Sequence, residues 1–188
     1  MGTVGWIILG VIVLLVIFLI AIYNRLVSLN QRATQSWSDI SVQLKQRHDL
    51  IPNLVETVKG YATHERGTLE AVTQARNAAV AATNPQAQAQ AENMLTGALR
   101  QLFAVAEAYP DLKANQNFLQ LQSELSDIEN KIAASRRFFN NSVQEYNSSI
   151  QQFPAVLLAG MFGFTQRGFF ELDEAEKTAV NTAPSVKF

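Results

Sequence analysis

The chain has 188 residues, a formal net charge of −1 and no cysteine. The lack of cysteine excludes disulfides, thiolate zinc sites and cysteine nucleophiles. Because no Lys/Arg run exceeds the pair Arg136-Arg137, the chain has no basic patch to attract nucleic acid, which is not an expected partner.

The first feature along the chain is an unbroken apolar run from Trp6 to Ile22. If the uncharged stretch from Val4 to Tyr23 is helical, it rises about 30 Å, which is the hydrocarbon thickness of a bilayer. The run therefore predicts a transmembrane anchor within residues 1–24. Aromatic and basic residues favour the membrane interfaces, so we expect Trp6, Tyr23 and Arg25 to mark them.

Three other interpretations fit this run less well. A cleaved signal peptide would have a basic start and a small-x-small site, which Ala21-Ile22-Tyr23-Asn24 does not provide. An N-myristoylation motif would need Ser or Thr where Trp6 stands. A buried core helix would need an apolar surrounding, and the remaining chain is too polar to supply one.

The flanks of the run predict its orientation. The amino side carries only the terminal amine, whereas Arg25 and Arg32 follow the run before the first acid, Asp39. The positive-inside rule then places the N-terminus outside the cell and the C-terminal domain in the cytoplasm.

Beyond the anchor, a composition rich in Ala, Gln, Asn, Leu and Glu is typical of helices. Proline is tolerated at a helix start and not in its interior, so the prolines divide the chain. We expect one helix from Val4 to Leu50 and a second beginning near Pro52. A third should start at Pro85, with Asn84 as its cap.

The fourth predicted helix runs from Asn115 to Phe153, where apolar residues recur at steps of 3 and 4 as in a coiled-coil seam. Short connections between long helices make neighbours antiparallel. The predicted fold is therefore all-α: an N-terminal transmembrane helix continuous with an elongated antiparallel, up-down bundle of about four long helices. The predicted domains are the anchor (1–24), the bundle (25–154) and a Phe/Gly-rich segment with a polar tail (155–188).

The segment after Pro154 interleaves glycines with large apolar residues. It either folds back over the open end of the bundle or docks on a neighbouring subunit, a partner or the bilayer surface. The candidate interaction surface consists of Phe162, Phe164, Phe169 and Phe170.

Residues suited to catalysis or metal binding are few. The two histidines each stand beside an acid, in His48-Asp49 and His64-Glu65, and adjacent helical residues point about 100° apart, so they do not chelate together. Because Glu65 interrupts an apolar stripe, we expect it to pair with an Arg or Lys of a neighbouring helix. No HExxH, GxSxG or phosphate-binding glycine loop occurs, so we predict no catalytic residue, metal or cofactor.

Three blocks of the sequence resemble the bacterial LemA family: Tyr23 to Glu65, Glu129 to Pro154, and Phe162-Gly163-Phe164. The likeness covers nearly the whole chain, with one departure at Phe139, where the family usually has tyrosine. It implies a single-pass protein of the bacterial inner membrane with a helical cytoplasmic bundle, and it supplies no activity. Family members are often encoded near membrane metalloproteases.

These observations favour a non-enzymatic, membrane-anchored helical scaffold that self-associates, with a role in envelope maintenance. The expected partners are the lipid bilayer, further copies of the chain and other membrane proteins. Two alternatives stay open at this point. One is an adaptor or regulator of a membrane protease, and the other is a metal-dependent enzyme that uses His48 and His64.

Overall fold

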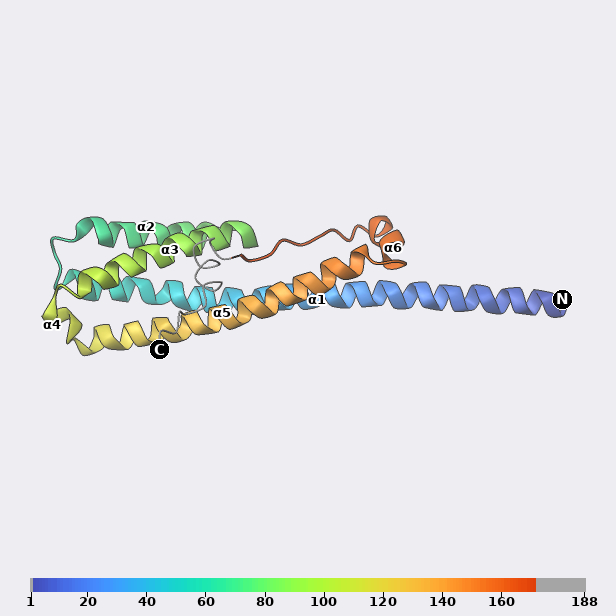
Figure 1. Ribbon diagram of the computed structural model, residues 1–188, viewed down its shortest axis with the longest axis horizontal. Helices are drawn as coiled ribbons and strands as arrows, with labels where there is room; N and C mark the ends of the chain where they lie inside the picture. Colours follow the sequence, from blue (N-terminus) through green and yellow to red (C-terminus); the bar gives the residue numbers. More distant parts are fainter. Residues whose placement is uncertain (1, 172–188) are drawn as a thin grey trace, which may run out of the picture. The chain divides into compact units, whose positions relative to one another are not determined.

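The computed structural model describes residues 2–171, and within that range it contains helices and no strands (Figure 1). The prediction of an all-α chain is confirmed. The polar tail predicted after residue 171 lies outside the described residues. The helices are α1 (Thr3–Lys59), α2 (Arg66–Ala81), α3 (Pro85–Ala106), α4 (Pro110–Lys113), α5 (Gln116–Gln151) and α6 (Ala155–Met161).

The chain divides into two compact units. Within the described residues, unit 1 combines those up to Ser38 with Arg137–Arg167, and unit 2 combines Asp39–Arg136 with residues 168–171. Helices α1 and α5 each contribute residues to both units. The apolar run and α6 belong to unit 1, whereas α2, α3 and α4 belong to unit 2.

Helix α1 continues past Pro52 to Lys59, so the predicted start of a second helix near Pro52 is wrong. A proline lacks the N–H that would donate to the carbonyl four residues earlier, here that of His48. Arg76 of α2 supplies a replacement, because its Nε donates to the His48 carbonyl over 3.3 Å. A tertiary hydrogen bond thus replaces the lost helical one. The turn expected near Pro52 lies instead after Lys59, between α1 and α2.

The start of α3 follows the prediction. Pro85 takes an N-terminal position, and the Asn84 side chain accepts a hydrogen bond from the Ala87 amide over 2.8 Å. Asn115 does the same for α5, accepting from the Phe118 amide over 3.0 Å. These caps satisfy amides that have no partner within their own helices.

The core of unit 2 is built from the apolar faces of its helices. Burial of a large aliphatic side chain contributes about 1.5–3 kcal/mol, so this cluster is a main stabilising term of the unit. Its fully buried members include Ile51, Leu54, Val58, Val72, Leu95, Leu102 and Leu112.

A second cluster forms the core of unit 1. Leu26 and Leu29 of α1 meet Tyr146 and Ile150 of α5. Farther along the same pair of helices the rings of Trp37 and Phe139 are 5.3 Å apart. Most positions of the predicted apolar seam are buried in α5: Phe118, Leu125, Ile128, Ile132, Phe139, Val143, Tyr146 and Ile150. Phe153, the last residue of the predicted seam, lies beyond the end of α5 and is 80% exposed.

The predicted membrane run occupies the N-terminal part of α1. Among the described residues, α1 is the one helix long and apolar enough to cross a membrane, and none of its most apolar window is buried. Length and composition alone support this assignment. In unit 1, therefore, α1 changes from a rod exposed on all sides to a helix with one buried face at Leu26.

Candidate functional site

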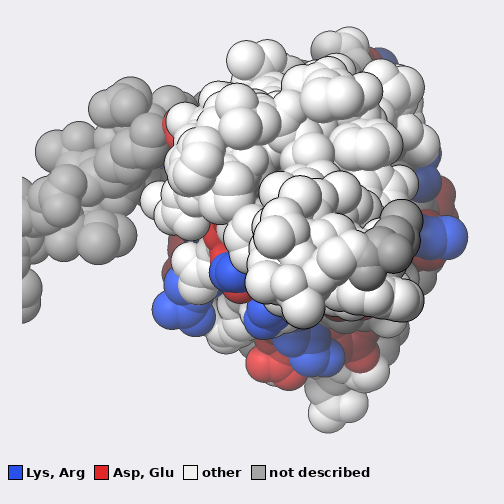
Figure 2. Space-filling model, turned by 90° about the vertical axis from the view of Figure 1, so that its right-hand side faces the viewer, with Lys and Arg blue, Asp and Glu red and all other residues white. Residues whose placement is uncertain are grey.

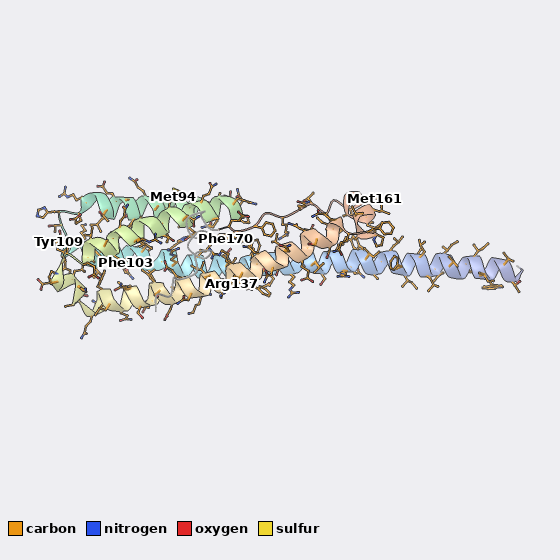
Figure 3. All side chains as sticks on the ribbon, viewed as in Figure 1. Met94, Phe103, Tyr109, Arg137, Met161 and Phe170 are labelled. Atoms are coloured by element: carbon orange, nitrogen blue, oxygen red, sulfur yellow. The ribbon has the colours of Figure 1, made fainter. Side chains whose placement is uncertain are left out.

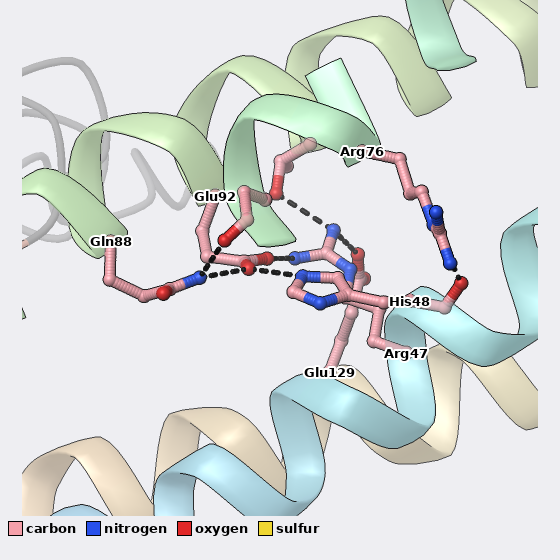
Figure 4. A network of polar contacts seen from close by, with 8 residues as sticks. Arg47, His48, Arg76, Gln88, Glu92 and Glu129 are labelled. Atoms are coloured by element: carbon pink, nitrogen blue, oxygen red, sulfur yellow. Dashed lines mark hydrogen bonds and ion pairs between the residues drawn. The ribbon is translucent and has the colours of Figure 1, made fainter. Parts of the chain in front are cut away.

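A buried network of polar side chains connects α1, α2, α3 and α5 within unit 2 (Figure 4). Its central group is the Glu92 carboxylate of α3, which faces Arg47 and His48 of α1. Arg47, His48 and Glu92 are 3%, 6% and 5% exposed, so the network lies inside the unit and not on its surface.

Both oxygens of Glu92 accept hydrogen bonds. Oε2 accepts from Nη1 of Arg47 over 3.1 Å, while Oε1 accepts from Nε2 of His48 over 2.6 Å. Oε1 also accepts from Nε2 of Gln88, one turn earlier on α3, over 2.9 Å. Three donors on one buried carboxylate compensate for its removal from water.

The Arg47 guanidinium reaches a second carboxylate through its other end. Nη2 donates to Thr96 Oγ1 over 2.8 Å and to Glu129 Oε1 of α5 over 2.9 Å. Its Nε is buried and has no hydrogen-bond partner in the part of the chain that the structure describes. A cavity of about 290 Å³ adjoins this side of the network and is lined in part by Arg47, Arg100 and Glu129.

Backbone contacts extend the network to α2. Gln88 Nε2 donates to the Ala79 carbonyl over 2.9 Å, and Arg76 donates to the His48 carbonyl as described above. The network therefore holds side chains from α1, α2, α3 and α5 and backbone carbonyls of α1 and α2. A buried polar network of this kind favours one helix register, because a shift would leave buried donors or acceptors unpaired.

The other predicted polar positions are not brought into this network. His64 is exposed, in the turn between α1 and α2. Glu65 accepts from the Tyr109 hydroxyl over 3.3 Å rather than from the expected Arg or Lys. Burial raises the pKa of Tyr109, and the charge of Glu65 adds to that rise. Among residues 2–171, no three His, Asp or Glu side chains gather as a metal site requires.

An aromatic cluster in unit 1 brings together residues from the end of the apolar run and from the segment after α6. The Tyr23 ring lies 4.9 Å from Phe162 and 5.8 Å from Phe164, edge to face in both cases. Such pairs contribute about 0.5–1.5 kcal/mol beyond burial. Phe164 packs against the unit 1 core, whereas Phe162 stays 56% exposed.

Gly163 separates these two phenylalanines and ends α6. Its φ of +73° lies in the left-handed region that favours glycine. The Phe164 amide then donates to the Ala159 carbonyl over 2.9 Å, and the Phe162 amide donates to the Leu158 carbonyl over 3.0 Å. The bond from Phe164 to Ala159 is the 6→1 hydrogen bond of a Schellman motif. This motif needs a left-handed residue after the helix, which explains why glycine stands between the two phenylalanines.

Asn147 of α5 anchors the chain that follows. Its Oδ1 accepts from the Arg167 amide over 2.9 Å, and its Nδ2 donates to the Arg167 carbonyl over 2.8 Å. The Arg167 side chain reaches α1, donating to Asn30 Oδ1 over 2.9 Å and to Thr34 Oγ1 over 2.7 Å. The segment 162–167 is thus attached to both α1 and α5.

The remaining predicted site residues lie apart from these contacts. Trp6 is 65% exposed on the apolar run, and Arg25 is exposed just beyond it. Phe169 and Phe170 belong to unit 2, where Phe169 is half-buried and Phe170 is 3% exposed. Phe170 therefore presents little surface to a partner.

Sequence reasoning missed Arg47 and the Asn147–Arg167 pairing. Arg47 stands three residues after Leu44 and four before Ile51, on the apolar face of α1. That spacing marks a charged residue on a buried face, which needs a partner. For Asn147 the sequence carries no such signal, because its partner is the backbone of a segment without regular structure.

Comparison with known proteins adds a family assignment. The sequence model of the LemA family matches residues 36–188. A protein named LemA from Metamycoplasma hominis is 30% identical over 164 residues, which cover 85% of this chain and 74% of that protein. The magnetosome protein MamQ of Magnetospirillum gryphiswaldense is 26% identical over 186 residues, covering 85% of this chain and 68% of MamQ.

A MamQ protein of Paramagnetospirillum magneticum is 24% identical over the same shares of the two chains. None of these names is that of an enzyme. The relatives and the apolar stretch of α1 together indicate a membrane-associated protein. From the match over residues 36–188 and the identity to the M. hominis protein, this chain belongs to the LemA family.

Proposed function

We propose that the protein is a non-enzymatic interaction scaffold anchored in the bacterial inner membrane by the N-terminal part of α1. One observation carries this proposal. A single uninterrupted helix contains both the exposed apolar run from Trp6 to Ile22 and the buried face that begins at Leu26. No flexible linker separates the anchor from the packed helices, so the anchor is part of the folded structure.

The charges of unit 1 support a cytoplasmic location for the packed helices. Its described residues include four arginines, at positions 25, 32, 137 and 167, and a single acid, Glu145. Arg32 pairs with Glu145 over 3.2 Å and lies over the Phe138 ring. An excess of arginine beside a span favours the cytoplasmic side.

Self-association is the second part of the proposal, and we assign it to the membrane run because the burial pattern supports that location. The regular seam of α5 is buried within the chain and is not available to a second copy. The apolar run, by contrast, exposes its side chains on every face and includes Gly10, beside which there is open space. Small residues permit close approach of helices within a bilayer.

The mass of the detergent-solubilised chain tests this part. We expect a defined oligomer by light scattering after size-exclusion chromatography. The matched control replaces Trp6–Ile22 with leucines, which keeps the hydrophobicity and removes the specific packing surface, and it should be smaller. A native chain that is strictly monomeric across detergents would contradict self-association.

A further inference from the structure

Helix α6 exposes an apolar surface that the fold does not use. Phe153 and Met161 are about four-fifths exposed, at 80% and 79%, and Leu157 is 62% exposed. Phe162 and Val156 add to the same surface at 56% and 44%. We call these five residues the α6 face; Met161 is labelled in Figure 3.

The opposite side of α6 is well packed. Ala159 is 5% exposed within the unit 1 core, and Ala155 and Phe164 pack against the same cluster. Helix α6 therefore buries small residues and exposes large apolar ones. This distribution is the reverse of a surface helix in water, whose outer face is polar.

The α6 face continues from the apolar surface of α1. Phe162 touches Tyr23 at the end of the run, and Ile22 packs against the cluster that holds Ala159. All of these residues belong to unit 1. A bilayer that covers the run up to Tyr23 therefore also reaches the level of α6.

Charge is absent from both parts of this surface. Residues 2–24 and 150–166 contain no Lys, Arg, Asp or Glu. Figure 2 shows a near surface that is mostly white, with charged side chains toward its lower part and its edges. Arg25 and Arg167 directly follow these two stretches in the sequence, as expected for segments that meet anionic headgroups.

We infer that the α6 face is a second membrane contact: Leu157, Met161 and Phe162 lie in the interface of the bilayer beside the emerging α1. This inference rests on the proposed anchor and adds a lipid contact some 130 residues later in the chain. The depth expected for such a face is about 5–10 Å into the boundary between headgroups and acyl chains.

Site-directed spin labelling tests the inference directly, because the full-length chain has no cysteine to remove. Single cysteines replace Leu157 or Met161, and the labelled chain is reconstituted in vesicles that contain anionic lipid. Collisions with oxygen, which concentrates in lipid, are compared with collisions with a water-soluble nickel chelate. Val80→Cys and Met94→Cys are matched controls, at 54% and 57% exposed apolar positions of unit 2.

We expect labels at 157 and 161 to favour oxygen over nickel several-fold and the two controls to show the reverse order. The inference would be overturned if the nickel chelate reached the labels at 157 and 161 as readily as the label at 80. Exclusion of both reagents would overturn it as well, because a second copy of the chain would then cover the face.

A label at Leu14, which is 68% exposed in the apolar run, separates this outcome from failure of the anchor. If Leu14→Cys reports lipid while Leu157→Cys reports water, the α6 inference alone is wrong. If both report water, the anchor is wrong too. Unchanged circular dichroism of each labelled chain shows that the fold is kept.

Discussion

Loss of charge at Glu92 should destabilise the protein strongly. In Glu92→Gln, a single amide oxygen replaces two carboxylate oxygens that accept from Arg47, His48 and Gln88. The new amide NH2 group must face one of these donors, and among residues 2–171 Arg47 keeps Glu129 alone as an anionic partner. Breaking a buried ion pair in this way costs about 3–5 kcal/mol.

Thermal unfolding of the full-length chain in mild detergent, followed by far-ultraviolet circular dichroism, measures this effect. A loss of that size lowers the Tm of a chain of this length by about 6–20 °C. The matched control is Glu129→Gln, because the Glu129 side chain is 50% exposed and its pair with Arg47 is screened by water. That change should cost about 0–1 kcal/mol.

The double variant Arg47→Met with Glu92→Leu removes both charges at similar volume and should be more stable than Glu92→Gln alone. Equal and small losses in Glu92→Gln and Glu129→Gln would refute the reasoning, because they would show that the network does not hold the helices together.

Three further predictions concern unit 1. Gly163→Ala should lower stability by about 1 kcal/mol through its left-handed backbone alone, because the space beside Gly163 is open; Gly160→Ala within α6 is the control and should be neutral or stabilising in thermal unfolding. Asn147→Ala removes both bonds to the Arg167 backbone, at a cost of about 1–3 kcal/mol, and should speed tryptic cleavage after Arg167; an unchanged rate would contradict the anchoring role. Burial raises the pKa of Tyr146 above its ordinary value of 10.0, and Arg167 acts in the opposite direction. The folded state thus favours the neutral phenol, so its contribution to stability is complete below pH 10 and is lost as the pH rises through the raised pKa; urea unfolding of Tyr146→Phe should lack this alkaline loss.

Periodic features of this fold could be predicted from the sequence because their causes are local. Apolar steps of 3 and 4 identify the buried seam of α5, and the pair Asn84-Pro85 marks the start of α3 through side-chain capping. The length and composition of the run from Trp6 to Ile22 are likewise properties of one segment.

Features that depend on partners distant in sequence could not be predicted. Pro52 is expected to begin a helix, yet it lies inside α1. The carbonyl that it leaves without a helical donor, that of His48, accepts from Arg76, 28 residues beyond His48. Glu65 has a tyrosine partner because Tyr109 lies within reach, which periodicity does not reveal.

The candidate site was identified only in part. The sequence marks His48 as a candidate polar residue beside an acid, but its partner in the structure, Glu92, lies 44 residues away. Of the four predicted phenylalanines, Phe162 and Phe164 meet Tyr23, whereas Phe170 is buried in unit 2. Composition marks the segment after Pro154 as unusual. The helix cap at Gly163 in the structure then shows that Phe164 turns toward the core and Phe162 does not.

The central claim is that the apolar run of α1 crosses the membrane with the packed helices on the cytoplasmic side. Single cysteines at Thr3 and Val80, treated with a membrane-impermeant maleimide in spheroplasts, test it most directly. We expect labelling of Thr3→Cys in intact spheroplasts and of Val80→Cys only after lysis. Labelling of Val80→Cys in intact spheroplasts would contradict the orientation, and protection of both positions until lysis would contradict the span itself.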